Sequence, residues 1–387
     1  MTEKEVELLR QERKQIFTDA VSKKKMPKRI PLLSQVWTWK IIDSGFKLSE
    51  ALYDYDKMIE AVSIHQQRYG WDSYMDLGTR NSIQMTDALG KRFYVINDET
   101  GDVNYIDKDV MKFEDYDKII NEGLFKYYFE TALVSKCGYT DRETALENIG
   151  KAARERVKFS QFAKRVNSVM VNEHGVPSIA FGKPILPTEM LFCALRGIKG
   201  YSTDIRRAPE TVIEALSIIN EASYEQFSKM LADFKDNDTF LFPVRLVSLA
   251  HTVMNPKQYE KIYWPFYKKY IFDLADKGLG AMLFTEGSMS HLLDFYKDVP
   301  SGKFALLLEM DDIFEMKKKL PNITVAGGFP ANLLATGTPE KCVEYVKKLE
   351  EELAFDGSYI FAFNKMISYP KDAKRENMMA ITEYLRR

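Results

Sequence analysis

The segments Gly280-Ala-Met-Leu-Phe-Thr-Glu-Gly287 and Lys303-Phe-Ala-Leu-Leu-Leu-Glu-Met310 decide the fold prediction. Each is a short apolar run that stops abruptly at a glutamate. A third run, Ile323–Ala326, stops at Gly327-Gly328. Short apolar runs bounded by glycine or charge, with helix-like segments between them, are typical of buried parallel strands in β-α-β units. Enzymes built from such units place their chemistry at the C-terminal ends of the strands.

Eight strand-helix units of this kind follow one another along the 387 residues. The pattern predicts a single (β/α)8 barrel domain over residues 1–387, with an N-terminal helical extension at 1–29 and a β-hairpin insertion at 79–110. The alternative is a doubly wound open sheet. It has less support, because no GxGxxG or GxxxxGK[ST] motif occurs at a strand-to-helix turn.

The composition excludes several classes of partner. The chain has 55 Lys+Arg against 56 Asp+Glu, a net charge of −1, so nothing favours nucleic acid or an anionic membrane surface. Cys137, Cys193 and Cys342 are far apart and form no disulfide framework. The N-terminus is charged, and no apolar run approaches the roughly 18 residues of a membrane span. We therefore expect a cytoplasmic protein.

The last third of the chain resembles the uroporphyrinogen decarboxylase superfamily. Residues 326–340, Ala-Gly-Gly-Phe-Pro-Ala-Asn-Leu-Leu-Ala-Thr-Gly-Thr-Pro-Glu, carry the resemblance. Glu376-Asn377, after Pro370, matches the closing segment of the family, and Arg207-x-Pro209-Glu210 and Tyr263-Trp-Pro265 fit it as well. The resemblance implies a distorted (β/α)8 barrel with its site at the C-terminal mouth.

Two departures from the family patterns narrow the function that the resemblance implies. True decarboxylases have an arginine-rich segment after the first strand and a His after the last, whereas Gln35–Lys40 has no arginine and Phe363–Met366 no His. A multiply anionic tetrapyrrole needs several fixed guanidinium groups. Members that act on coenzyme M bind zinc through a His-x-Cys-Gly motif and a later Cys. The matching residues Phe284–Gly287 and Asn364–Met366 contain neither type of ligand.

The resemblance therefore favours the methyltransferase branch. The leading prediction is transfer of a methyl group from a small, methoxylated donor to the cobalt of a corrinoid (cobalamin). A partner carrier protein would supply the corrinoid, because the chain lacks the carrier motif Asp-x-His-x-x-Gly. The alternatives are a decarboxylase or lyase acting on a small carboxylate or tetrapyrrole, and a non-enzymatic corrinoid- or tetrapyrrole-binding protein. Some relatives are dimers, so a homodimer is a further expectation.

Glu286 and Glu309 follow neighbouring predicted strands, and we expect them to face the same mouth as catalytic residues. One of them would act as a general acid that protonates a departing oxygen. In a second hypothesis both carboxylates and His251 hold a metal such as zinc, and in a third they only cap helices or pair with Lys or Arg. The predicted substrate-binding residues are Trp37, Trp39, Asp76, Phe181, His251, Phe284, Phe329 and Asn364.

Overall fold

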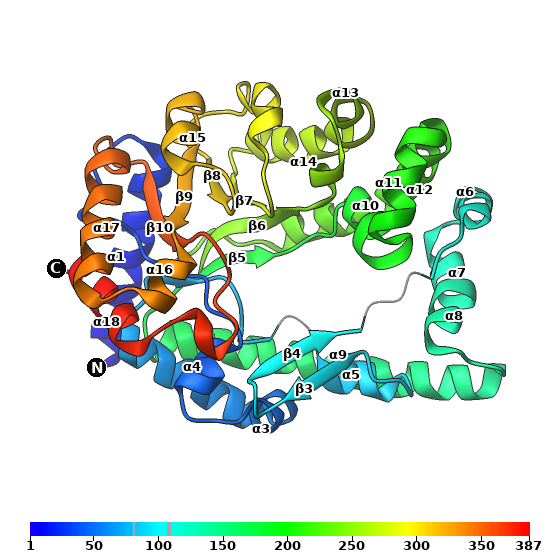
Figure 1. Ribbon diagram of the computed structural model, residues 1–387, viewed down its shortest axis with the longest axis horizontal. Coiled ribbons are helices and arrows are strands. Elements are labelled where there is room, and N and C mark those ends of the chain that lie inside the picture. Colours follow the sequence, from blue (N-terminus) through cyan, green and yellow to red (C-terminus); the bar gives the residue numbers. More distant parts are fainter. Residues whose placement is uncertain (80–81, 107–109) are drawn as a thin grey trace.

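The structure is a computed structural model that describes residues 1–79, 82–106 and 110–387. Eight strands form one parallel sheet in the order β1-β2-β5-β6-β7-β8-β9-β10 (Figure 1). Its first and last strands meet, because the Phe361 amide donates to the Pro31 carbonyl at 2.9 Å and the Ile367 amide to that of Gln35 at 3.0 Å. The predicted (β/α)8 barrel is confirmed. The barrel strands are β1 (Leu33–Ser34), β2 (Ser73–Tyr74), β5 (Ser178–Gly182), β6 (Phe240–Ser248), β7 (Ala281–Thr285), β8 (Phe304–Leu308), β9 (Thr324–Phe329) and β10 (Tyr359–Phe363).

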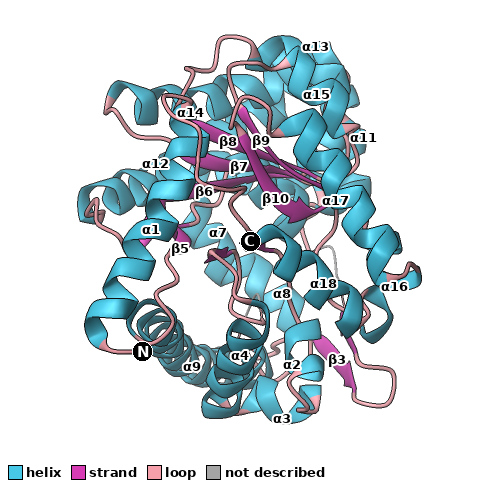
Figure 2. Cartoon of the chain, turned by 90° about the vertical axis from the view of Figure 1, so that its left-hand side faces the viewer, coloured by secondary structure: helices cyan, strands magenta, loops and turns pink. Residues whose placement is uncertain are grey.

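Helices surround the strands on all sides (Figure 2). Those of the N-terminal half are α1 (Glu3–Ser22), α2 (Trp39–Asp43), α3 (Leu48–Tyr53), α4 (Tyr55–Tyr69), α5 (Ile83–Ala88), η1 (Phe113–Asp115), α6 (Tyr116–Glu122), α7 (Leu124–Tyr127), η2 (Tyr128–Ala132), α8 (Leu133–Cys137) and α9 (Arg142–Asn172). Those between β5 and β8 are α10 (Pro187–Glu189), η3 (Met190–Leu195), α11 (Gly197–Arg207), α12 (Pro209–Asp233), η4 (Ala250–Val253), α13 (Pro256–Gln258), η5 (Tyr259–Tyr263), α14 (Trp264–Asp276) and η6 (Ser290–Tyr296). The rest are α15 (Ile313–Lys319), α16 (Ala331–Thr336), α17 (Pro339–Leu353), η7 (Pro370–Asp372) and α18 (Arg375–Leu385).

Strand β9 is longer than the sequence predicts. Gly327-Gly328 does not end the strand but lies within it, with φ angles of +107° and +88° that favour glycine. A side chain at Gly328 would come within 2.7 Å of Ile313 on α15. The two glycines therefore let the strand turn while α15 packs closely against it.

Helix α1 closes the N-terminal end of the barrel. The Thr2 hydroxyl accepts from the Glu5 amide at 3.3 Å, and the Glu5 carboxylate accepts from the Thr2 amide at 2.7 Å, which fixes the start of the helix. Further along, Phe17 and Ala20 pack into the barrel interior against inward-facing strand residues. The Thr324 hydroxyl on β9 donates to the Ala20 carbonyl at 2.9 Å. With this end filled, the opposite, C-terminal end is left for a site.

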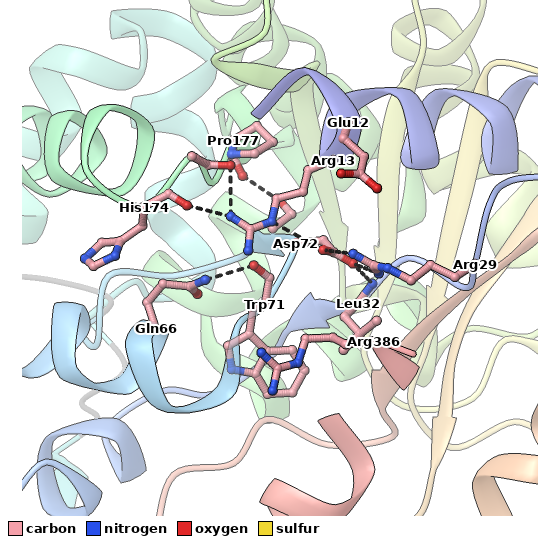
Figure 3. Close-up of polar contacts among 12 residues, drawn as sticks. Glu12, Arg13, Arg29, Leu32, Gln66, Trp71, Asp72, His174, Pro177 and Arg386 are labelled. Carbon is pink, nitrogen blue, oxygen red and sulfur yellow. Dashed lines mark hydrogen bonds and ion pairs between the residues drawn. The ribbon is translucent and has the colours of Figure 1, made fainter. Parts of the chain in front are cut away.

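Asp72 joins the N-terminal extension to the barrel base (Figure 3). Its carboxylate is fully buried and accepts from both guanidinium nitrogens of Arg29, at 2.5 and 2.7 Å, and from the Leu32 amide at 2.9 Å. Arg13 of α1 lies 3.4 Å away and donates to the His174 carbonyl at 2.6 Å. The ion pair lies at the end of the barrel away from the usual site, so we assign it a structural role.

The hairpin β3 (Tyr94–Asn97) and β4 (Asp102–Tyr105) is a separate antiparallel pair within the predicted insertion. It packs against the helices between β1 and β2: the Ser49 amide of α3 donates to Asp98 at 2.9 Å, and Ile96 joins their apolar cluster. The predicted insertion 79–110 also includes positions outside the described residues. Within the described part of the chain, no helix is long and apolar enough to cross a membrane.

Candidate functional site

A cavity of about 510 Å³ lies at the C-terminal end of the barrel. It is lined by residues of or after β2, β5, β6 and β7, including Ser178 and Phe240 at the starts of β5 and β6, by Met366 after β10, and by one face of helix α9. Its charged lining residues are Asp76, Lys164, Lys183, Arg245 and Glu286. A cavity of this size, mostly apolar with a few convergent polar groups, suits a small organic ligand.

The cavity extends sideways because the barrel is weakly joined between β2 and β5. These strands pair at a single position, Tyr74 with Ser178, whereas β6 and β7 pair over five. Helix α9 covers the gap and contributes Phe159 and Lys164 to the cavity wall. The site therefore has an inner part on the barrel axis and an outer part between α9 and β5.

Asp76 lies in the inner part, as the sequence predicts for a mouth residue, beside a buried lysine. Its Oδ1 accepts from the Gly78 amide at 2.9 Å and lies 3.5 Å from Lys40 Nζ. The two side chains are only 8% and 2% exposed, and burial lowers the pKa of Lys40. The second carboxylate oxygen, Oδ2, is buried and accepts no hydrogen bond within the described residues. Asp76 thus lines the cavity with its carboxylate held by Gly78 and Lys40, while Oδ2 itself is closed off.

Glu286 also lines the cavity, directly after β7. Its amide donates to the Ser248 carbonyl of β6 at 2.9 Å, which fixes the turn that carries its half-buried side chain. Arg245 of β6 faces the same cavity and donates to the Met75 carbonyl at 2.8 Å. Two carboxylates and a guanidinium thus share the inner part of the site.

Glu309 does not line the cavity. It accepts from the Gly287 amide at 2.6 Å and so holds the turn that follows Glu286. Asp311 continues the support, since its carboxylate accepts from the Ser288 hydroxyl at 2.5 Å and from the Met289 amide at 2.8 Å. The hydrogen bond from Gly287 gives Glu309 a structural contact, in the turn after Glu286 and outside the cavity lining.

His251 is 1% exposed and does not line the cavity. Burial lowers its pKa to about 4, so the ring is neutral near pH 7. It lies close to the backbone of Ser288, but neither ring nitrogen makes a hydrogen bond of ordinary geometry. Across the described ranges, no three His, Cys, Asp or Glu side chains gather as a metal ion would require, so the predicted set of Glu286, Glu309 and His251 is not brought together.

Only some of the aromatic residues predicted to bind substrate lie at the cavity. Phe181 and Phe284 line it, but Trp37, Trp39 and Phe329 do not. Trp39 begins α2 and packs against His65 and Tyr69, with ring centroids 6.1 Å away in each case.

Phe329 and Asn364 serve the structure around the barrel. Phe329 belongs to the outer layer, where its ring meets Tyr345 of α17 with centroids 5.6 Å apart. The Asn364 side chain accepts from the Ala331 amide at 2.9 Å and holds the start of α16.

Glu189 is a buried carboxyl that the sequence reasoning missed. It accepts from the amides of Leu249 and Ala250 at 3.0 and 3.1 Å and from the Tyr263 hydroxyl at 3.0 Å. Burial, and to a smaller extent the nearby Glu286, nevertheless raise its pKa to about 7. Its only signal in the sequence is a carboxylate two residues after Pro187 in an otherwise apolar helix. The sequence reasoning also did not predict that Lys40, Arg245 and residues of α9 belong to the site.

Comparison with known proteins agrees with this architecture. The model of the family "Uroporphyrinogen decarboxylase (URO-D)" matches residues 166–387. Among solved structures, a methyltransferase from Methanosarcina mazei superposes with a TM-score of 0.63 at 13% sequence identity, covering 97% of this chain and 98% of that one. No curated protein sequence matches. At such low identity the structural likeness shows the shared fold.

Proposed function

This chain belongs to the uroporphyrinogen decarboxylase family, and from that premise we propose that it is a methyltransferase subunit. It binds a small methyl donor in the cavity and presents the methyl group to the cobalt of a corrinoid held by a partner protein. The family hosts more than one reaction in one fold, so the choice rests on the site.

The charge of the cavity is the observation that carries the proposal. Its described lining has one arginine and two lysines against two carboxylates. A tetrapyrrole with many carboxylates needs several fixed guanidinium groups, and the described lining has one. The lining and a volume of about 510 Å³ support a smaller ligand with little net charge.

Glu286 is the residue that we assign to the leaving group. When an ether carbon–oxygen bond breaks, the methyl group passes to the nucleophile and the oxygen must take up a proton. A carboxyl group on the cavity wall, in a turn fixed by Glu309 and Asp311, is positioned to give it. Asp76, held beside Lys40, adds a second carboxylate to the cavity lining.

The corrinoid, when bound, supplies the nucleophile that accepts the methyl group. None of the four histidines lines the cavity. His251 is buried, and His174 is hydrogen-bonded to Ser63 at 2.7 Å. These features support a corrinoid that arrives on a carrier protein docked over the mouth. Proton donation is preferred to a metal here because the described residues do not form a three-ligand cluster.

The test mixes the purified chain with cob(I)alamin and a panel of methyl ethers, and follows methyl–cobalt formation by its absorption spectrum. We expect methyl transfer with at least one donor, and a loss of about 10²-fold or more in Glu286→Gln. Glu315→Gln is the matched control, because it makes the same change on the exposed side of α15, outside the cavity. Release of CO2 from a tetrapyrrole, or equal rates in both variants, contradicts the proposal.

A further inference from the structure

The outer part of the cavity is an apolar slot whose far end carries lysines. Phe159 of α9, Phe181 of β5 and Phe240 of β6 line it. The rings of Phe181 and Phe240 meet edge to face with centroids 5.3 Å apart. Phe181 is still 38% exposed, a large apolar surface for a ring already packed on one side. Covering it with an apolar ligand is favourable.

The charges along the cavity are separated. Asp76 and Glu286 belong to the inner part, whereas Lys164 on α9 and Lys183 just after β5 belong to the outer part. Both lysines are exposed, and Lys164 has no ion-pair partner within the described chain. The preceding turn of α9 adds Ser160, a neutral neighbour on the same face. The outer end therefore attracts an anion, whereas the inner part, where Lys40 and Arg245 lie with Asp76 and Glu286, has no excess of negative charge.

We infer that the slot between α9 and β5 is a binding subsite for the anionic end of an amphipathic monocarboxylate, with Lys164 as a specificity-determining residue. The apolar body of the ligand lies on the phenylalanine wall, and its opposite end reaches Glu286. That this ligand is the methyl donor rests on the proposed function, whereas the anion preference of the slot does not.

The experiment measures binding of two probes of nearly equal shape, 4-methoxybenzoate and the neutral 4-methoxybenzamide, by isothermal titration calorimetry of the full chain without corrinoid. We expect the benzoate to bind about fivefold more tightly than the benzamide, the size of a solvent-exposed charge pair. The preference should shrink with added salt. It should disappear in Lys164→Met and reverse in Lys164→Glu.

Lys158→Met is the matched control. Lys158 lies on the same helix and is 62% exposed, but pairs with Glu155 at 2.7 Å and does not line the cavity. It should keep the preference of the wild type. Phe181→Ala should weaken both probes by a similar factor, because the apolar body is common to them.

Equal binding of the two probes to the wild type, no binding of either, or an unchanged preference in Lys164→Met overturns the inference. These outcomes are distinct from failure of methyl transfer, since no turnover is measured. Conversely, efficient methyl transfer from 4-methoxybenzoate that is unaffected by Lys164→Met would overturn the inference and leave the proposed function intact.

Discussion

Lys40 Nζ lies 3.5 Å from Asp76 Oδ1, with both side chains almost fully buried. The same ammonium donates to the Asp76 carbonyl at 3.1 Å. Lys40 thus balances the charge of the Asp76 carboxylate. The other carboxylate oxygen, Oδ2, accepts no hydrogen bond within the described residues. A buried pair of this kind costs desolvation, and removing one partner leaves an uncompensated charge.

Lys40→Met should therefore lower the free energy of unfolding by about 3 kcal/mol, measured by urea denaturation. In the double variant with Asp76→Asn, the combined loss should be smaller than the sum of the single losses by about 1–3 kcal/mol. Strict additivity would show that the two groups do not interact in the folded chain.

The buried carboxyl of Glu189 predicts a pH dependence of stability. Its pKa rises from an ordinary 4.5 to about 7 in the folded chain. Between these values the folded state binds more protons than the unfolded state, so this contribution to stability is lost as the pH rises from about 4.5 through 7. The total is of order 2–3 kcal/mol.

Glu189→Gln should flatten that dependence, because an amide does not titrate. Urea midpoints of the wild type and the variant, measured from pH 5 to pH 8, should converge or cross as the wild type loses stability. Parallel curves would assign the pH dependence to other groups.

The turn after β7 rests on two acidic residues with unequal numbers of contacts. Asp311 accepts from the Ser288 hydroxyl and from the Met289 and Ser290 amides, whereas Glu309 accepts from Gly287 alone. Asp311→Ala should cost about 2–3 kcal/mol of unfolding free energy and Glu309→Ala about 1. Chemical denaturation of both variants checks the order, and a larger loss in Glu309→Ala would contradict it.

Local patterns were enough to predict the barrel and part of its site. Buried strands such as β7 and β8 have a clear signal, and the residue after such a strand, Glu286, does reach the cavity. The role of Glu309 depends on a hydrogen bond from Gly287, in the turn after the preceding strand β7. A distance of that kind has no periodic signature in the sequence.

The rest of the site depends on contacts between residues that are far apart in the sequence, and it was therefore not predicted. The α9 wall exists because β2 and β5 barely pair, and the paired residues Tyr74 and Ser178 are about a hundred positions apart. Glu189 is buried by contacts to the loop after β6. Neither the gap nor that loop contact is visible in composition or spacing.

Phe284 and Phe329 point to opposite faces of the barrel sheet, because alternate residues of a strand face opposite sides. This difference gives the last prediction. Both strands are almost entirely buried on both faces, so no alternation of polar and apolar residues marks the inward side. In the structure Phe284 belongs to the interior cluster and lines the cavity, whereas Phe329 belongs to the outer layer beneath α17.

Phe329→Ala should lower the free energy of unfolding by about 3–5 kcal/mol, because it leaves a void in the outer layer, and leave the affinity for 4-methoxybenzoate unchanged. Phe284→Ala should change that affinity by severalfold, because it alters the cavity wall next to Glu286. Calorimetric titration at a temperature where both variants are folded separates the effects. A change in affinity in Phe329→Ala as large as that in Phe284→Ala would place the ligand elsewhere than this cavity.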